Sequence, residues 1–145
     1  MSEENKTIVR RSVEEVFSAQ GDLDAADEIF APDYVGHNPI SPEDVRGLEG
    51  VKEEASMYRN AFPDVQLSVE EQVAEGDKVV TRWIAVGTHQ GEMMGIAPTG
   101  NQVRVPGVTI NRIEGGKIVE QWEIFDALGM MQQLGALPTP EDAQA

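Results

Sequence analysis

The residue whose type and position most clearly suggest chemistry is Asp126, an acid at the end of a predicted strand. The strand, residues 117–125, follows two glycines that fit a two-residue hairpin turn. Side chains alternate between the faces of a strand, so one face carries Asp126 with Ile118, Glu120, Trp122 and Ile124. If that face is the core, the carboxylate loses solvation and becomes a base suited to removing a proton from carbon. A structural role is equally open, because Asp is a favoured helix N-cap and a helix is predicted to follow.

Three polar residues could assist such a base. His37 precedes Asn38-Pro39 and is predicted to be an acid or hydrogen-bond donor at the edge of a pocket, or a tie that holds the proline loop. Asn38 could polarise a carbonyl group or start a turn. His89 falls on the same strand face as Trp83, and both a catalytic role and a structural hydrogen bond are open for it.

Aromatic residues could form the wall of a pocket for a flat ligand, although aromatic side chains are more often plain core. The candidates are Tyr34, Tyr58, Trp83 and Trp122, and Trp122 leads because it is predicted to share a face with Asp126. Counting back from the glycine pair places Thr109 opposite Trp122, which adds Thr109 to the substrate-binding candidates. Tyr58 lies on an apolar helical stripe and is predicted to be core.

Composition narrows the classes of function. The 145 residues suit one domain, and the net charge of −15 argues against nucleic-acid binding and against anionic membrane surfaces. The same charge favours a neutral or apolar ligand. The chain has no cysteine and only two histidines, so neither a Cys-based nor a multi-His metal site is predicted. No apolar run approaches the length of a membrane span, and we expect a soluble cytoplasmic protein.

The elements that would position these residues are segregated along the chain. Hydrophobic periodicity predicts helices over residues 3–20, 23–30, 47–62 and 126–134, and long strands over 65–73, 79–89, 102–114 and 117–125. Helices followed by hairpin-linked strands indicate an α+β fold, in which a curved antiparallel sheet and N-terminal helices enclose a pocket. We predict a single domain over 1–137 and a flexible tail over 138–145.

Five short segments carry a resemblance to a known family. They are Ala-Phe-Pro-Asp at 61–64, Glu-Gly-Asp at 75–77, Gly-Thr-His-Gln-Gly at 87–91, Gly-Lys-Ile-Val-Glu-Gln-Trp at 116–122 and Gln-Leu-Gly at 133–135. In this order they resemble the SnoaL-like polyketide cyclases of the NTF2-like, ketosteroid-isomerase-like superfamily, over about residues 5 to 137. The resemblance implies a cone-shaped α+β fold with a deep apolar pocket and chemistry without metal or organic cofactor.

The resemblance also implies a mechanism. In characterised cyclases of this family, an Asp that matches Asp126 removes a proton from an activated carbon, and the carbanion closes a ring by intramolecular aldol attack. Those cyclases also carry a His in the strand before the last, where this sequence has Thr109 and Asn111. Our first hypothesis is therefore a cyclase acting on a small apolar carbonyl compound, ahead of an isomerase and an epoxide hydrolase.

The second hypothesis is a non-catalytic NTF2-like module for ligand binding or dimerisation, which the missing His supports. Fold alone does not decide between the two. Under either hypothesis an apolar outer sheet face would pair with a copy of itself. We therefore predict a homodimer formed sheet to sheet, through Val86, Val108, Ile110 and Phe125.

Overall fold

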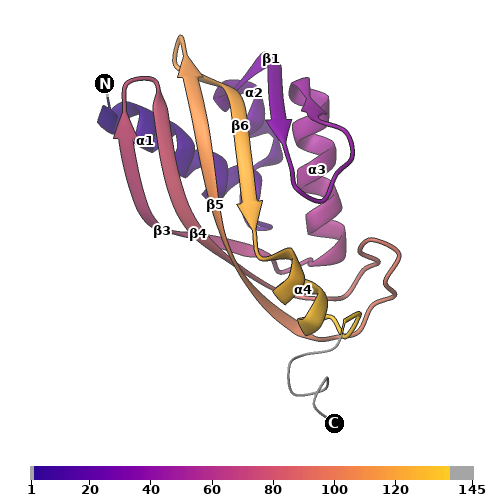
Figure 1. Cartoon of the computed structure of the whole chain (residues 1–145). Coiled ribbons are helices and arrows are strands. Elements are labelled where there is room, and N and C mark those ends of the chain that lie inside the picture. The colour runs from indigo at the N-terminus through magenta and orange to yellow at the C-terminus, as the bar shows by residue number, and fades with distance from the viewer. Residues whose placement is uncertain (1, 138–145) are drawn as a thin grey trace.

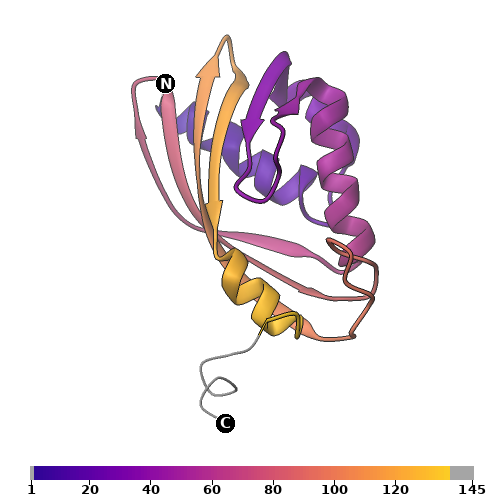
Figure 2. The same cartoon turned by 45° about the vertical axis from the view of Figure 1, so that its right-hand side comes forward.

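The computed structural model of the chain describes residues 2–137, which form a strongly curved sheet with helices packed across one side (Figure 1, Figure 2). The first helix, α1 (Ser2–Arg11), continues as a π-helical turn, η1 (Ser12–Val16). The predicted helix over 3–20 thus ends early. The reason is that the Ala19 N–H leaves the helical pattern and donates to the Val65 carbonyl, 2.8 Å away.

The predicted helix over 23–30 forms as two short helical turns, and a strand follows them. These elements are η2 (Leu23–Ala25), α2 (Ala26–Ile29) and β1 (Phe30–His37). The Asp22 side chain caps η2 by accepting from the Asp24 N–H. A two-residue strand, β2 (Val45–Arg46), leads into the long helix α3 (Gly47–Ala61), which was predicted almost to the residue.

The long strands also form as predicted. They are β3 (Gln66–Glu75), β4 (Lys78–Thr88), β5 (Gln102–Glu114) and β6 (Lys117–Phe125), and α4 (Ala127–Gln133) follows them. The sheet order is β2-β1-β6-β5-β4-β3. Consecutive long strands pair antiparallel, whereas β1 joins the β6 edge in parallel. The sheet therefore has two more strands than predicted, and β1 carries the chain after Phe30 beside β6.

The β5–β6 hairpin contains a bulge that decides which residues face the helices. Gly115 and Gly116 have φ values of 58° and 79°, as the predicted tight turn requires. Ile113 then pairs with Ile118, but Arg112 pairs with Glu120, so one extra residue is inserted on β6. From there to its end, β6 presents the opposite face from the one that simple counting predicts.

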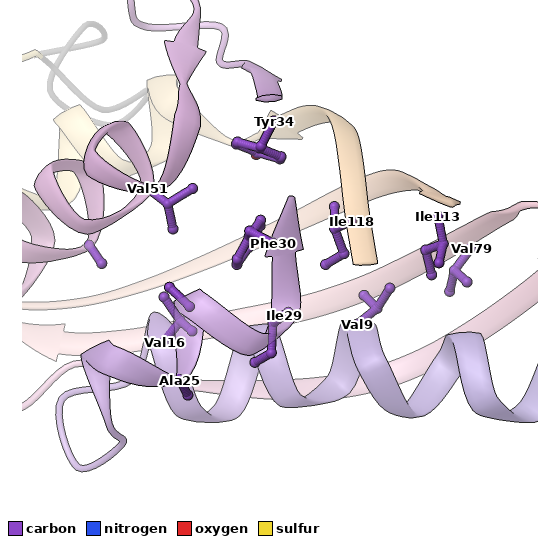
Figure 3. Packing of buried hydrophobic residues seen from close by; sticks show 12 residues of the cluster. Val9, Val16, Ala25, Ile29, Phe30, Tyr34, Val51, Val79, Ile113 and Ile118 are labelled. Carbon is purple, nitrogen blue, oxygen red and sulfur yellow. The ribbon is translucent and has the colours of Figure 1, made fainter. Parts of the chain in front are cut away.

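The main core lies where α1, α2 and α3 pack on β1 and the turn end of the long hairpins, as Figure 3 shows. Phe30 is its centre, in edge-to-face contact with Tyr34 at a centroid distance of 4.8 Å. Val9, Val51 and Ile118 are fully buried around it. A second cluster, which includes Phe62, Val105, Met130 and Leu134, joins α4 to the other end of the sheet.

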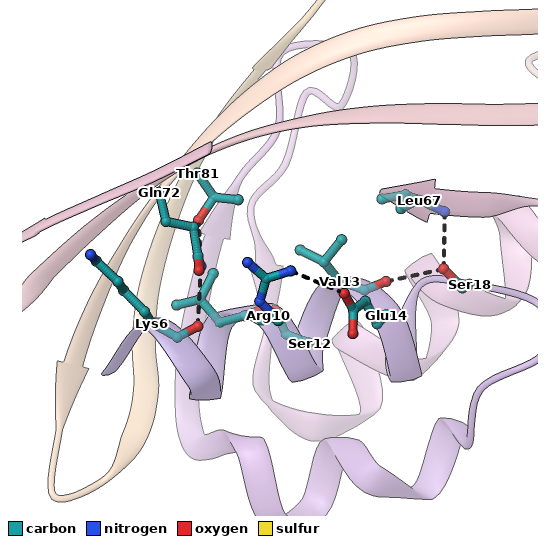
Figure 4. A network of polar contacts seen from close by, with 10 residues as sticks. Lys6, Arg10, Ser12, Val13, Glu14, Ser18, Leu67, Gln72 and Thr81 are labelled. Carbon is teal, nitrogen blue, oxygen red and sulfur yellow. Dashed lines mark hydrogen bonds and ion pairs between the residues drawn. The ribbon is translucent and has the colours of Figure 1, made fainter. Parts of the chain in front are cut away.

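Polar contacts tie the N-terminal helix to the sheet edge (Figure 4). The Gln72 side-chain amide reaches the Lys6 carbonyl at 3.1 Å and the Thr81 hydroxyl at 3.2 Å. Further along, the Ser18 hydroxyl donates to the Val13 carbonyl and accepts from the Leu67 N–H. These contacts attach the N-terminal helical segment to the sheet at two places, at Lys6 in α1 and at Ser18 just after η1.

Two further predictions concern the C-terminal tail and membrane-spanning segments. The predicted tail over 138–145 lies outside the described residues. Within residues 2–137, no helix combines the length and the apolar character needed to cross a bilayer.

Candidate functional site

A largely apolar cavity lies between the concave face of the sheet and the helices, with a volume of about 90 Å³. The sheet contributes side chains from β3 to β6, and η1, α3 and α4 close the other side. Its apolar wall includes Phe17, Phe62, Trp83, Val105 and Phe125. The titratable residues among its described lining are Glu54, Tyr58 and Glu123, and that lining includes no Lys, Arg or His.

Glu123 reaches this cavity because of the bulge in β6. Beyond the bulge, Gln121, Glu123 and Phe125 point inward, and Thr109 stands directly across from Glu123 on β5. Burial, and secondarily the nearby charge of Glu54, raises the pKa of Glu123 to about 8. A carboxyl group titrating near neutral pH can act as either a general base or a general acid.

Glu54 enters the same cavity from the helical side. It lies on α3 one turn before Tyr58, so the two side chains share one helix face. Burial raises the pKa of Glu54, and a hydrogen bond from the Asn38 side-chain amide, 3.0 Å long, opposes that rise. Two buried carboxyl groups therefore act on each other across an apolar space.

A polar chain supports Glu123 from the sheet. The Asn111 amide donates to Gln121 Oε1 at 2.7 Å, which turns the Gln121 amino group toward Glu123, 3.4 Å away. In the described structure the Thr109 hydroxyl is buried without a hydrogen-bond partner, and the buried Tyr58 hydroxyl has none beyond a contact with the Asn38 side-chain amide. Burial of an unpaired hydroxyl is costly, so these two groups are available to a polar atom of a ligand.

Asp126 does not line the cavity, so its predicted place on the inner face is wrong. It is the N-cap of α4, and its Oδ1 accepts from the Gly129 N–H at 2.8 Å. The inserted residue in β6 turns Asp126 outward together with Trp122 and Ile124. Trp122 is likewise partly exposed on the outer face, which corrects its predicted place in the pocket wall.

The two histidines also lie outside the cavity lining. His37 sits on the outer face, where it bonds Glu120 at 2.8 Å and Asp44 at 3.0 Å and stacks on Trp122. His89 is fully buried behind the wall, where its Nδ1 accepts from the Thr99 N–H. Neither histidine is placed to act on a molecule in the cavity.

The other predicted residues lie at or beside the cavity. Trp83 and Thr109 line it, and Asn38 contacts the lining residue Glu54. Tyr34 is buried next to it, where burial and then the charges of Glu54 and Glu123 raise the pKa of its hydroxyl group. Within residues 2–137, no group of three acidic or histidine side chains is arranged to hold a metal ion.

Prediction from the sequence missed Glu54, Gln121 and Glu123, and it preferred a core position for Tyr58. A signal existed for Glu54, because it interrupts the apolar helical stripe on which Tyr58 lies. For Gln121 and Glu123 the sequence pattern pointed the other way, since their neighbours Trp122 and Ile124 are the apolar residues.

Comparison with known proteins agrees on one family. The family model described as SnoaL-like polyketide cyclase matches residues 7–134. Aklanonic acid methyl ester cyclase AcmA of Streptomyces galilaeus is 31% identical over 95% of this chain and 94% of its own. Two solved structures superpose closely. The SnoaL-like protein of Jannaschia sp. CCS1 has a TM-score of 0.84 and 28% identity, covering 94% of this chain and 95% of its own. IdmH of Streptomyces antibioticus has a TM-score of 0.78 and 35% identity, covering 90% and 98%.

Proposed function

The chain belongs to the SnoaL-like polyketide cyclase family, and we propose that it cyclises a polyketide-type ester through the buried carboxyl pair Glu54 and Glu123. The curated relatives that it matches are named as cyclases, so the chain is a cyclase-like enzyme. The observation that carries the proposal is the placement of two carboxyl groups in one apolar cavity. In this proposal Glu54 and Glu123, which line the cavity, carry out the acid–base chemistry that the sequence analysis assigned to Asp126.

The proposed reaction needs a base and a hydrogen-bond donor. A carboxylate removes a proton from a carbon next to a carbonyl group, and the resulting enolate attacks a second carbonyl within the same molecule. One C–H bond breaks, one C–C bond forms, and the attacked oxygen takes up a proton, so the overall change is an isomerisation. The O–H of Tyr58 donates to no protein acceptor in the described structure, so it is available to donate to the enolate oxygen.

The apolar lining of the cavity favours an apolar substrate, and the small volume of the cavity limits the size of that substrate. Drug-sized ligands occupy pockets of roughly 300–1,000 Å³. The cavity holds about 90 Å³, so a polyketide-sized molecule must widen it or leave part of itself outside. Small carbonyl esters are therefore the better first probes.

Proton exchange at carbon tests the proposal without knowledge of the natural substrate. A small β-keto ester is incubated in D₂O, and loss of its α-proton signal is followed by NMR. We expect wild type to exceed the uncatalysed rate, and the double variant Glu54→Gln/Glu123→Gln to lose about 10²–10⁴-fold of that enhancement. Asp126→Asn is the control, since Asn also caps helices and should retain activity.

A second candidate is a binding module without catalysis. The absence of His from the described cavity lining favours it, because the cyclases that the chain resembles carry a His in the strand before the last, in the region of Thr109 and Asn111. Wild type that binds the β-keto ester but exchanges its proton no faster than buffer would support this candidate and exclude the cyclase.

A further inference from the structure

We propose that the base of this enzyme is Glu54 on α3 and that Glu123 on β6 is the acid that delivers a proton to the substrate oxygen. The inference rests on the proposed function and assigns the roles within its carboxyl pair. In this assignment Glu54, a residue of α3, is the second acid–base group of the site, a position that a histidine of the strand before the last has in the cyclases that the chain resembles.

The first step of the argument is the charge of the pair. Glu54, Tyr58 and Glu123 are the titratable groups facing the cavity, and Tyr34 lies behind them on β1. The tyrosine hydroxyls stay neutral, because burial and the two glutamates raise their pKa values further. Like charges without a counter-cation do not both ionise in a buried space, so near neutral pH the pair holds one proton.

The second step locates the charge on Glu54. Asn38 Oδ1 accepts from the Ile40 N–H at 3.0 Å, which fixes the orientation of the Asn38 amide. Its amino group therefore points at Glu54 Oε2, also 3.0 Å away. A donor held in this way stabilises a carboxylate.

The third step locates the proton on Glu123. The Gln121 amino group is its hydrogen-bond donor in the described structure, and the contact is long at 3.4 Å. The floor of the cavity around Glu123 is otherwise apolar or hydroxylic, with Phe125 beside it and Thr109 opposite. Glu123 is thus the less supported of the two as an anion, in accord with its raised pKa.

The roles follow from this distribution. Ionised Glu54 takes the proton from the substrate carbon, and protonated Glu123 gives its proton to the attacked carbonyl oxygen. After ring closure Glu54 holds a proton and Glu123 a charge. Transfer of that proton from Glu54 to Glu123 restores the starting state, so no further reactant is needed.

Single variants in the same deuterium-exchange experiment separate the two roles. Glu54→Gln should lose at least about 10²-fold, because the base is gone. Glu123→Gln should lose only roughly tenfold, because its amide can still donate a hydrogen bond to the oxygen. Glu53→Gln, the same change at the exposed neighbour on α3, is the matched control and should keep wild-type activity.

The pH profile gives a second readout. Wild-type exchange should rise as Glu54 ionises and fall above about pH 8 as Glu123 ionises. In Glu123→Gln the alkaline fall should disappear and leave a plateau. Greater loss in Glu123→Gln than in Glu54→Gln would reverse the roles and overturn the inference while leaving the cyclase proposal intact.

A titration tests the pair without any turnover. The Glu123 carboxyl carbon, followed by NMR, should titrate at lower pH in Glu54→Gln than in wild type, because the neighbouring charge is gone. An unchanged titration would overturn the pairing itself. Absence of exchange in wild type would instead contradict the proposed function, whatever the titration shows.

Discussion

Glu120 and Glu123 stand three residues apart on one strand, and their surroundings move their pKa values in opposite directions. Glu120 faces outward, where hydrogen bonds from His37 and Arg112 lower its pKa. Glu123 faces the cavity, where burial and then the charge of Glu54 raise its pKa to about 8. The comparison shows that the two faces of β6 give an acid different surroundings: the outer face supplies hydrogen bonds that favour the charged form, and the inner face favours the protonated form.

The largest expected effect on the free energy of unfolding comes from replacing Glu123, the acid on the inner face of β6, by a neutral residue. Native Glu123 keeps a proton that the unfolded chain releases near pH 4.5, so stability falls as pH rises from there to about 8. The pKa difference of about 3.5 units, at 1.4 kcal/mol per unit, sets an upper value of about 5 kcal/mol, and we expect Glu123→Gln to stabilise the protein at pH 8.5 by up to this amount. Urea unfolding at pH 5 and 8.5 measures this, and equal stability of both proteins at pH 8.5 would contradict it.

Glu120→Gln is the matched outer variant and should act with the opposite sign. Its lowered pKa means that ionised Glu120 stabilises the fold above about pH 4.5, a contribution that is lost as pH falls through its folded value. Partly exposed ion pairs are worth under about 1 kcal/mol, so the loss at neutral pH should be small. Stabilisation of both variants at pH 8.5 would remove the contrast between the faces.

A second contrast between the faces lies on β5, at Gly107 and Val108. A Cβ atom at Gly107 would overlap the Trp83 indole ring, whereas Val108 points outward and is 38% exposed. Gly107→Ala should cost about 1–3 kcal/mol by overpacking, and it should slow exchange by displacing Trp83 in the cavity wall. Val108→Ala should change stability by within about 0.5 kcal/mol. Thermal unfolding of the two variants decides whether the inner face is the packed one.

The order and type of the elements could be read from the sequence, because hydrophobic periodicity and turn residues report on local structure. The helix at 47–61, the long strands and the glycine turn all appear as predicted. The parallel attachment of β1 to β6 could not, since it depends on packing between segments some 85 positions apart (His37 pairs with Trp122).

The site was harder to predict than the fold, for a physical reason. Face assignment assumed that apolar residues point inward, and on β6 the rule is inverted. Trp122 and Ile124 are on the outer surface, while Gln121 and Glu123 face the cavity. One inserted residue produces this inversion, and a bulge has no strong local signature. Functional sites are where local pattern and final structure are expected to disagree.

The apolar outer face itself supports the proposed homodimer, with one correction. Val108 and Ile110 lie on the outer side of the sheet, and Val86, at the rim of the cavity, is still 40% exposed, but the Phe125 side chain points into the cavity and cannot take part. Trp122 and Ile124 take its place across from Ile110 and Val108. We propose that this face pairs with a second copy of the chain.

Ile124→Glu tests the dimer. Ile124 is 72% exposed, and burial of such a side chain contributes about 1.5–3 kcal/mol. The variant should therefore weaken association by at least about tenfold, as measured by sedimentation across micromolar concentrations. Leu128→Glu, on α4 and 60% exposed, is the control and should leave association unchanged. Wild type that sediments as a monomer would contradict the proposal.

The smallest expected effect on stability comes from replacing His37, which links Glu120 and Asp44 on the outer face. Its hydrogen bond to Glu120, and secondarily that to Asp44, raises its pKa. The folded state therefore binds the proton more tightly, and the stabilisation is present below about pH 6.5 and lost as pH rises through the folded value. Since His37 is 35% exposed, solvent screening limits the contribution to under about 1 kcal/mol. His37→Gln should lower stability slightly at pH 5.5 and hardly at all at pH 8.5, with deuterium exchange unaltered at both. A large loss of exchange in His37→Gln would instead mean that the two faces of β6 are coupled through the adjacent Asn38, which contacts Glu54.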